Sequence, residues 1–323
     1  MRNFHAVKNP DAISRIDPAL LATLRRRAKV NRRKRDFAPP SFEKPVFIVS
    51  APRSGSALLF ERLSALPGVW TTGAESHELI EGIRPLHPRA KNYASNVLTE
   101  KDCAPEIAET LRRRFAMDMA DRDRRRYTDM PGDQRPSKVR LVEKTPKNAL
   151  RVSFLKAVFP DALFVFLYRN PRQSVASLME GWISGRFVAY RNLPGRAAPW
   201  SFLLIPGWRR LENASLAEIA TRQWETANRF IVDSLKTLPK SERLFIRYRD
   251  LGRKTEKTIR KISAFAGLET DARAEKILKP PPPLSSSTLS PPAPGKWKKH
   301  EKEIMALAPK WSPVDEMIRR GVF

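Results

Sequence analysis

The sequence has one cysteine, Cys103, among 323 residues. A single thiol cannot form an intramolecular disulfide and offers no cysteine cluster for zinc or an iron–sulfur centre. No apolar run approaches the roughly 18 residues that a membrane-spanning helix requires, and residues 1–11 lack the apolar segment of a secretory signal. These absences predict a soluble cytoplasmic protein.

Acidic residues are also scarce, because 34 Asp and Glu stand against 61 Lys and Arg, a formal net charge of +27. Such an excess attracts polyanions and anionic small molecules, but charge alone does not choose among nucleic acid, an anionic membrane and a phosphorylated nucleotide. With 41% hydrophobic content, the chain is long enough to bury one substantial core.

Basic residues are dense near the start, at residues 25–27 and 32–35, before two prolines at 39 and 40. We predict a basic N-terminal extension over residues 1–40 and one domain over residues 41–323. A solvated charged face is the ordinary interpretation of such a segment. Peripheral contact with an anionic membrane is the alternative.

Short apolar runs alternate with longer helical patterns in the rest of the chain, which is typical of βαβ units. The pattern predicts an α/β fold with a central, mainly parallel sheet of about five strands. The expected strands are 46–50, 69–71, 139–143, 163–167 and 244–247, and the expected helices are 58–66, 104–126, 171–180 and 216–238, with 122–127 as the solvated end of the second.

One motif directly follows the first strand, where residues 51–58 read APRSGSAL. A buried strand, a glycine-containing turn and a helix start bring backbone N–H groups together around one point, which suits a phosphate. Arg53 adds a permanent charge and Ser56 a hydroxyl donor. The Walker motif of nucleotide triphosphatases is absent, because the spacing is shorter and no Lys-Ser or Lys-Thr pair follows the glycine.

A second motif, YRNPRQSVASL, occupies residues 168–178 at the end of the fourth strand. Arg169 ends the strand and Ser177 lies about two turns into the next helix, so a guanidinium and a hydroxyl can bind one anion. A simple capped helix start, with Pro171 at its first position, would also produce this pattern. The occurrence of both motifs at strand ends favours two phosphate sites.

The two motifs resemble the 5′-phosphosulfate loop and the 3′-phosphate site of sulfotransferases that use 3′-phosphoadenosine 5′-phosphosulfate (PAPS), most closely the glycan- and tyrosylprotein-type branch and its bacterial relatives. Ala57 departs from the second threonine of that loop. The resemblance implies a P-loop-like three-layer αβα fold, PAPS as co-substrate, its product PAP, and no metal. It implies cofactor contacts from Arg53, Ser54, Gly55, Ser56, Ala57, Leu58, Arg169, Ser177, Tyr248, Ser287 and Lys296.

Three weaker matches follow in the family's order. Lys144, in EKTP at residues 143–146, corresponds to an active-site lysine, and Tyr248 to a tyrosine against the adenine. A solvated lysine and a core tyrosine are the alternatives. Ser287 and Lys296 lie in or just after the Pro- and Ser-rich segment 279–295, which we expect to be a loop that walls a site.

The resemblance also gives catalytic roles. Arg53 and Lys144 would stabilise the leaving-group oxygens while an acid–base residue removes the acceptor proton. Glu75 matches the glutamate of the glycan and tyrosine branches, and His77 keeps open the histidine of the phenol and steroid enzymes. We favour Glu75 as the base. A carboxylate that stabilises a helix start is the ordinary alternative.

The acceptor is not identified by the sequence beyond a hydroxyl or an amine. Residues 182–211 are rich in aromatic side chains and form either extra core or a wall for a small molecule, a glycan or a lipid-like chain. A P-loop kinase is a competing interpretation, although it lacks the expected lysine. A nucleic-acid-binding protein explains the charge but not two phosphate motifs, so we expect no specific nucleic acid partner.

Overall fold

Strand β2 (Val46–Val49) lies at the centre of the sheet and is completely buried. It pairs in parallel with β5 (Lys138–Lys144) on one side and β6 (Leu163–Tyr168) on the other. The strand order is β4-β3-β5-β2-β6-β9, with β1 paired to β5. This computed structural model describes residues 38–278 and 284–321.

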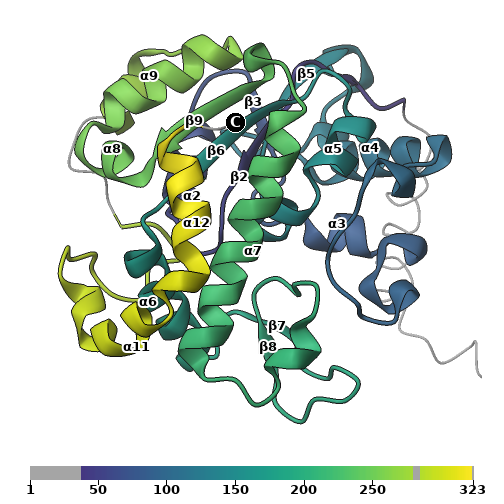
Figure 1. The fold of residues 1–323 in the computed structure, drawn as a ribbon. Helices are drawn as coiled ribbons and strands as arrows, with labels where there is room; N and C mark the ends of the chain where they lie inside the picture. The colour runs from purple at the N-terminus through teal and green to yellow at the C-terminus, as the bar shows by residue number, and fades with distance from the viewer. Residues whose placement is uncertain (1–37, 279–283, 322–323) are drawn as a thin grey trace, which may run out of the picture. The chain divides into compact units, whose positions relative to one another are not determined.

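Both faces of the sheet are covered, because side chains alternate along each strand. Val46 and Ile48 face one layer of helices with Leu163 and Val165. Phe47 faces the other way, with its ring 5.5 Å from that of Phe159. The first layer contains α2, α8, α9 and α10, and the second contains α4, α5, α7 and α12 (Figure 1). The predicted three-layer αβα architecture is confirmed.

All five predicted strands are present, with ends no more than one residue from the prediction. The main sheet contains two further strands of two residues each that were not expected, and one of them, β4, is antiparallel to β3. The strands of the main sheet are β1 (Ser41–Phe42), β2, β3 (Val69–Thr71), β4 (Ala120–Asp121), β5, β6 and β9 (Arg243–Arg247). A separate pair consists of β7 (Val188–Tyr190) and β8 (Trp200–Ser201).

The described helices begin with α2, whose start lies at the first phosphate motif, two residues earlier than predicted. They are α2 (Ser56–Leu63), α3 (His77–Glu81), α4 (Pro105–Asp118), α5 (Val152–Val158), α6 (Pro171–Ile183), α7 (Leu216–Lys236), α8 (Tyr248–Arg253), α9 (Thr255–Ala266), α10 (Ala272–Leu278), α11 (Glu301–Ala306) and α12 (Ala308–Arg319). The described residues contain no helix long and apolar enough to cross a membrane.

The helix expected over residues 104–126 is wrong in its second part. Helix α4 ends at Asp118, and the chain then forms β4 and a tight turn. The Asp121 side chain accepts hydrogen bonds from the backbone N–H groups of Asp123 and Arg125, and Arg124 has a positive φ of 62°. Residues 122–125 therefore form a turn, and Tyr127 begins a 3₁₀ helix, Tyr127–Asp129. The segment is not the solvated end of α4, because the Asp121 carboxylate competes for N–H groups that a helix would use.

The aromatic segment 182–211 contributes to the core. Trp200 and Trp208 are buried, and their ring centroids lie 5.7 Å apart. Gln223 of α7 donates to the carbonyls of Ser201 and Leu203 at 2.9 Å and so ties the segment to the second helix layer. The extra-core interpretation holds for these residues.

The contacts divide the chain into two units, Met1–Pro39 and Pro40–Phe323, and the division into a basic extension and one domain stays a prediction. Residues 1–37, and so nearly all of the predicted extension, lie outside the described residues, as do residues 279–283 of the Pro- and Ser-rich segment. The rest of that segment, 284–294, has no helix or strand, as expected.

Candidate active site

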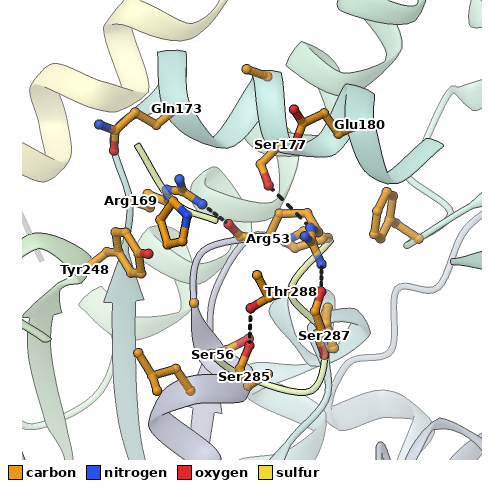
Figure 2. Close-up of a pocket in the computed structure, with 18 of the residues that line it drawn as sticks. Arg53, Ser56, Arg169, Gln173, Ser177, Glu180, Tyr248, Ser285, Ser287 and Thr288 are labelled. Carbon is orange, nitrogen blue, oxygen red and sulfur yellow. Dashed lines mark hydrogen bonds between the residues drawn. The ribbon is translucent and has the colours of Figure 1, made fainter. Parts of the chain in front are cut away.

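A cavity of about 1040 Å³ opens at the carboxyl ends of the parallel strands. This is the edge of an open α/β sheet where ligands usually bind. Its walls come from the loop after β2, the ends of β5 and β6, helix α6, the start of α8, segment 284–297 and part of the aromatic segment (Figure 2). The segments around Arg53, Lys144, Arg169, Tyr248 and Ser287, which the sequence predicted to border a site, all line this one cavity.

The loop after β2 has the backbone that an anion site requires. Gly55 has a φ of 89° and precedes the first turn of α2. A Cβ atom there would lie 2.4 Å from Cε2 of Tyr248, so both the backbone and the space favour glycine. Arg53 also has a positive φ, 65°. The N-terminus of α2 begins beside this loop, and helix N-termini attract anions.

The side chain of Arg53 connects three parts of the site. Its Nη1 donates to the carbonyl oxygen of Ser287 at 2.7 Å, and its Nε donates to Oγ of Ser177 at 3.4 Å (Figure 2). Burial and the neighbouring Arg169 lower the pKa of Arg53. Two guanidinium groups held this close favour an anion between them.

Arg169 extends from the end of β6 toward the same loop. Its Nη1 donates to the carbonyl oxygen of Arg53 at 2.8 Å, and its guanidinium carbon lies 4.5 Å from the centre of the Tyr248 ring. Burial lowers its pKa. Its Nε is buried and has no hydrogen-bond partner within residues 38–278 and 284–321. A buried charged donor without a partner is costly, which indicates a ligand.

The capped helix start that competed with a phosphate site at Arg169 is also present. The Asn170 side chain accepts a hydrogen bond from the backbone N–H of Arg172 at 3.0 Å, and Pro171 is the first residue of α6. The two interpretations are compatible, since the cap fixes the direction of α6 and directs Ser177 toward the cavity.

Lys144 and the two candidate bases lie at another side of the cavity. Nζ of Lys144 donates to Oε1 of Glu75 at 2.7 Å. Oε2 of Glu75 is 3.9 Å from Nδ1 of His77. Burial, followed by the charge of Lys147, lowers the pKa of His77. Lys144 is therefore not the solvated lysine of the competing interpretation, because its side chain is only 9% exposed.

Glu143 is a buried residue behind this group that the sequence analysis passed over. Its Oε1 accepts hydrogen bonds from Oγ of Ser76 at 2.7 Å and from Oγ1 of Thr145 at 2.5 Å, and its Oε2 accepts from Asn148 at 2.8 Å. Complete burial raises the pKa of Glu143. Glu143 joins β5 to the residue before α3 and so positions Glu75 and His77.

Other predicted contacts differ from expectation. The Ser54 hydroxyl is buried and is not part of the cavity wall, and Ser287 meets Arg53 through its carbonyl rather than its hydroxyl. Lys296 lies in the wall but pairs with Glu180 of α6 at 3.1 Å. The remaining predicted contacts, Gly55, Ser56, Ala57, Leu58 and Tyr248, line the cavity.

Several wall residues were not among the site residues predicted from the sequence. Glu180 holds Lys296 and, at 2.9 Å, Lys299. Its alignment with Ser177, three residues earlier on α6, was the available clue. Further residues in the wall are Lys147, Gln173, Arg186, Phe187, Phe202, Arg247, Arg253 and Trp297. In the part of the chain that the structure describes, no three His, Cys, Asp or Glu side chains are grouped to hold a metal ion.

The parallel sheet and the cationic cavity at its strand ends define an α/β protein with a site suited to an anionic ligand. Residues 45–272 match the model of the sulfotransferase family. The chain therefore belongs to the sulfotransferase family, and its reaction is the transfer of a sulfuryl group. The kinase and nucleic-acid interpretations receive no support from this match.

Solved structures of sulfotransferases resemble the chain at low identity. The sulfotransferase domain of the Synechococcus PCC 7002 olefin synthase is 23% identical, covers 75% of this chain and 78% of its own, and has a TM-score of 0.42. A sulfotransferase from Alicyclobacillus acidocaldarius is 14% identical, covers 88% of this chain and 97% of its own, and has a TM-score of 0.48. A mouse sulfotransferase complexed with PAP is 15% identical, covers 74% of this chain and 64% of its own, and has a TM-score of 0.36. No curated protein matches the chain.

Proposed function

We propose that the sulfuryl donor is PAPS. The observation that carries this proposal is the convergence of Arg53 and Arg169 in one cavity from the ends of two strands, β2 and β6. The unpartnered buried Nε of Arg169, named above for the described residues, provides a donor suited to a phosphate oxygen. A nucleotide with phosphates at both ends of its ribose needs two such cationic sites.

Each phosphate has its own set of groups in this proposal. The backbone N–H groups of residues 54–57 and the start of α2 bind the 5′-phosphosulfate. Arg169 and Ser177 bind the 3′-phosphate, and Tyr248 lies beside the adenine. Lys296 reaches the 3′-phosphate only after it leaves Glu180, its partner in the structure.

Transfer requires the acceptor oxygen or nitrogen to attack sulfur while the bond from sulfur to the bridging phosphate oxygen breaks. We assign removal of the acceptor proton to Glu75. Lys144 and Arg53 compensate the negative charge that grows on the leaving oxygen. Lys144 donates a hydrogen bond to Glu75, so its move to the leaving oxygen would free the carboxylate for the acceptor.

His77 is the competing base. It lines the cavity, and its lowered pKa keeps the ring neutral at pH 7 and able to accept a proton. Glu75 is preferred because the loop of residues 51–58 resembles that of the glutamate-using branch of the family. The two assignments differ in which substitution removes turnover.

The acceptor in this proposal is a small molecule with an apolar ring or chain next to its reacting group. The supporting feature is the inner side of the aromatic segment. There the rings of Phe187 and Phe202 stack with centroids 5.1 Å apart. Val188, Ala189 and Leu203 continue this wall of the cavity. Aromatic faces of this kind favour carbon-rich surfaces over strongly hydrated ones.

Thermal unfolding with added nucleotide tests the donor. PAP should raise the melting temperature far more than 5′-AMP or Mg-ATP at equal concentration, because only PAP uses both phosphate sites. Saturation at about 100 times the dissociation constant adds roughly 2.7 kcal/mol to the free energy of unfolding. Equal shifts for PAP and 5′-AMP would contradict the 3′-phosphate site, and a larger shift with Mg-ATP would favour the kinase.

A further inference from the structure

Arg169 makes two contacts that do not involve a 3′-phosphate. Its Nη1 donates to the main-chain carbonyl of Arg53 at 2.8 Å, and its guanidinium stacks on the Tyr248 ring at 4.5 Å. Both partners belong to the neighbourhood of the 5′-phosphosulfate loop. A guanidinium whose only role was to bind the 3′-phosphate would need neither contact.

The carbonyl that Arg169 holds belongs to a backbone that needs support. Arg53 has a φ of 65°, a left-handed conformation that non-glycine residues adopt rarely and at a cost. Such a conformation persists when surrounding contacts fix it. The hydrogen bond from Arg169 fixes the orientation of the peptide group that follows Arg53, and this peptide carries the N–H of Ser54.

Tyr248 fills the remaining side of the loop. Its Cε2 and Cδ2 lie 2.4 Å and 2.5 Å from the point where a Cβ of residue 55 would stand, so the ring packs directly on the Gly55 backbone. The ring also faces the Arg169 guanidinium (Figure 2). Loop, ring and guanidinium thus form one stack that joins the ends of β2, β6 and β9.

We propose that Arg169 and Tyr248 are positioning residues for the 5′-phosphosulfate loop, and that the two phosphate sites are therefore coupled. This inference rests on the proposed use of PAPS. A 3′-phosphate that binds Arg169 restricts its side chain, which in turn steadies the carbonyl of Arg53 and the loop N–H groups. By reciprocity, an ordered loop improves binding of the 3′-phosphate.

Hydrogen–deuterium exchange in the free protein tests the positioning roles without any nucleotide. Arg169→Ala and Tyr248→Leu should each speed exchange of the N–H groups in residues 53–57 about tenfold, because the loop opens more easily. Tyr248→Phe keeps the ring and should leave exchange of these N–H groups as in the wild type. Arg210→Ala, an exposed arginine on the 3₁₀ helix Trp208–Leu211, removes one charge away from the loop and should change nothing there.

Exchange in β6 is the internal reference, since it reports general loss of structure. Faster exchange confined to residues 53–57 supports the proposal. Unchanged loop exchange in both Arg169→Ala and Tyr248→Leu overturns it. A loss that Tyr248→Phe shares with Tyr248→Leu also overturns the stacking argument, because the ring would then not be the group that matters.

Nucleotide affinities test the coupling itself. Arg169→Ala should lower the affinity for 5′-AMP as well as for PAP, each by about tenfold or more, although 5′-AMP has no 3′-phosphate. The Ser177 hydroxyl contacts the side chain of Arg53 and not its carbonyl. Ser177→Ala should therefore lower the affinity for PAP and leave the affinity for 5′-AMP within about twofold of the wild type. If Arg169→Ala weakens PAP alone, the coupling is refuted while the 3′-phosphate site stands. If wild type does not prefer PAP over 5′-AMP, the donor assignment fails, and the exchange experiment still decides the positioning roles.

Discussion

Gly55→Ala is the most informative single substitution in the phosphate loop, because two separate penalties meet at this position. The backbone has a φ of 89°, and the new Cβ would lie 2.4 Å from the Tyr248 ring. Gly68, between α2 and β3, has a φ of 70° and has no atom within 4 Å of the corresponding Cβ position. It carries the conformational penalty alone and is the matched control.

The magnitudes follow from these two differences. Left-handed backbone costs an alanine roughly 1 to 2 kcal/mol, which is the full expectation for Gly68→Ala. Overpacking adds about 1 to 3 kcal/mol where a rigid neighbour must move. Gly55→Ala should therefore lower the free energy of unfolding by about 2 to 5 kcal/mol, and the displaced ring should also weaken PAP binding.

Urea denaturation followed by circular dichroism measures both variants, and titration with PAP measures binding. The double variant Gly55→Ala with Tyr248→Ala separates the penalties further, since removal of the ring abolishes the clash but not the backbone strain. Its cost should be less than the sum of the two single costs. Equal destabilisation by Gly55→Ala and Gly68→Ala, with additive costs in the double variant, would refute the argument that the ring packs on the loop.

Three further predictions concern the base, the titration of the half-buried His77 and the N-terminal extension. Glu75→Gln should lower kcat for transfer of labelled sulfate by about 10²- to 10⁴-fold with PAP affinity unchanged, whereas His77→Asn should be mild; the reverse pattern would identify the histidine as the base. Because burial lowers the pKa of His77 from 6.5, the unfolded chain binds its proton first, so stability should fall as the pH drops below 6.5, and the fall should be smaller in His77→Asn; identical pH profiles would contradict this. Deletion of residues 1–38 should leave PAP affinity intact, and a binding assay with anionic vesicles then tests the membrane alternative; loss of nucleotide binding would show that the extension belongs to the site.

Much of the donor half of the site could be predicted from the sequence, because its groups are local. A strand, a glycine turn and a helix start are adjacent in residues 46–63, and Arg169 and Ser177 lie on one strand and the following helix. Such short-range patterns fix backbone direction without knowledge of the tertiary fold. Parallel strands then bring the two motifs to the same edge.

Contacts between distant segments could not be predicted in the same way. The Glu180 carboxylate pairs with Lys296 and Lys299, more than a hundred positions later, and no periodic pattern links them. The end of α4 was missed for another reason. Its apolar spacing continues past Asp118, and the competing turn depends on hydrogen bonds from the single side chain of Asp121. The hydrogen bonds to the Asp121 carboxylate stabilise the turn more than the helix propensity of the neighbouring residues stabilises a longer α4.

The hairpin of β7 and β8 stands apart from the central sheet. It forms its own two-stranded sheet and shares no ladder with the central strands. Side-chain contacts join it to the rest of the domain, through Gln223 of α7, Trp182 of α6, and the Asn96 and Lys147 side chains that donate to the Tyr190 hydroxyl. Phe187, just before β7, also reaches the phosphate loop, because the guanidinium carbon of Arg53 lies 4.7 Å from the centre of its ring. With the acceptor role proposed above, the hairpin is the segment to exchange between enzymes when a new acceptor is wanted, and the exchange should keep an aromatic ring at residue 187.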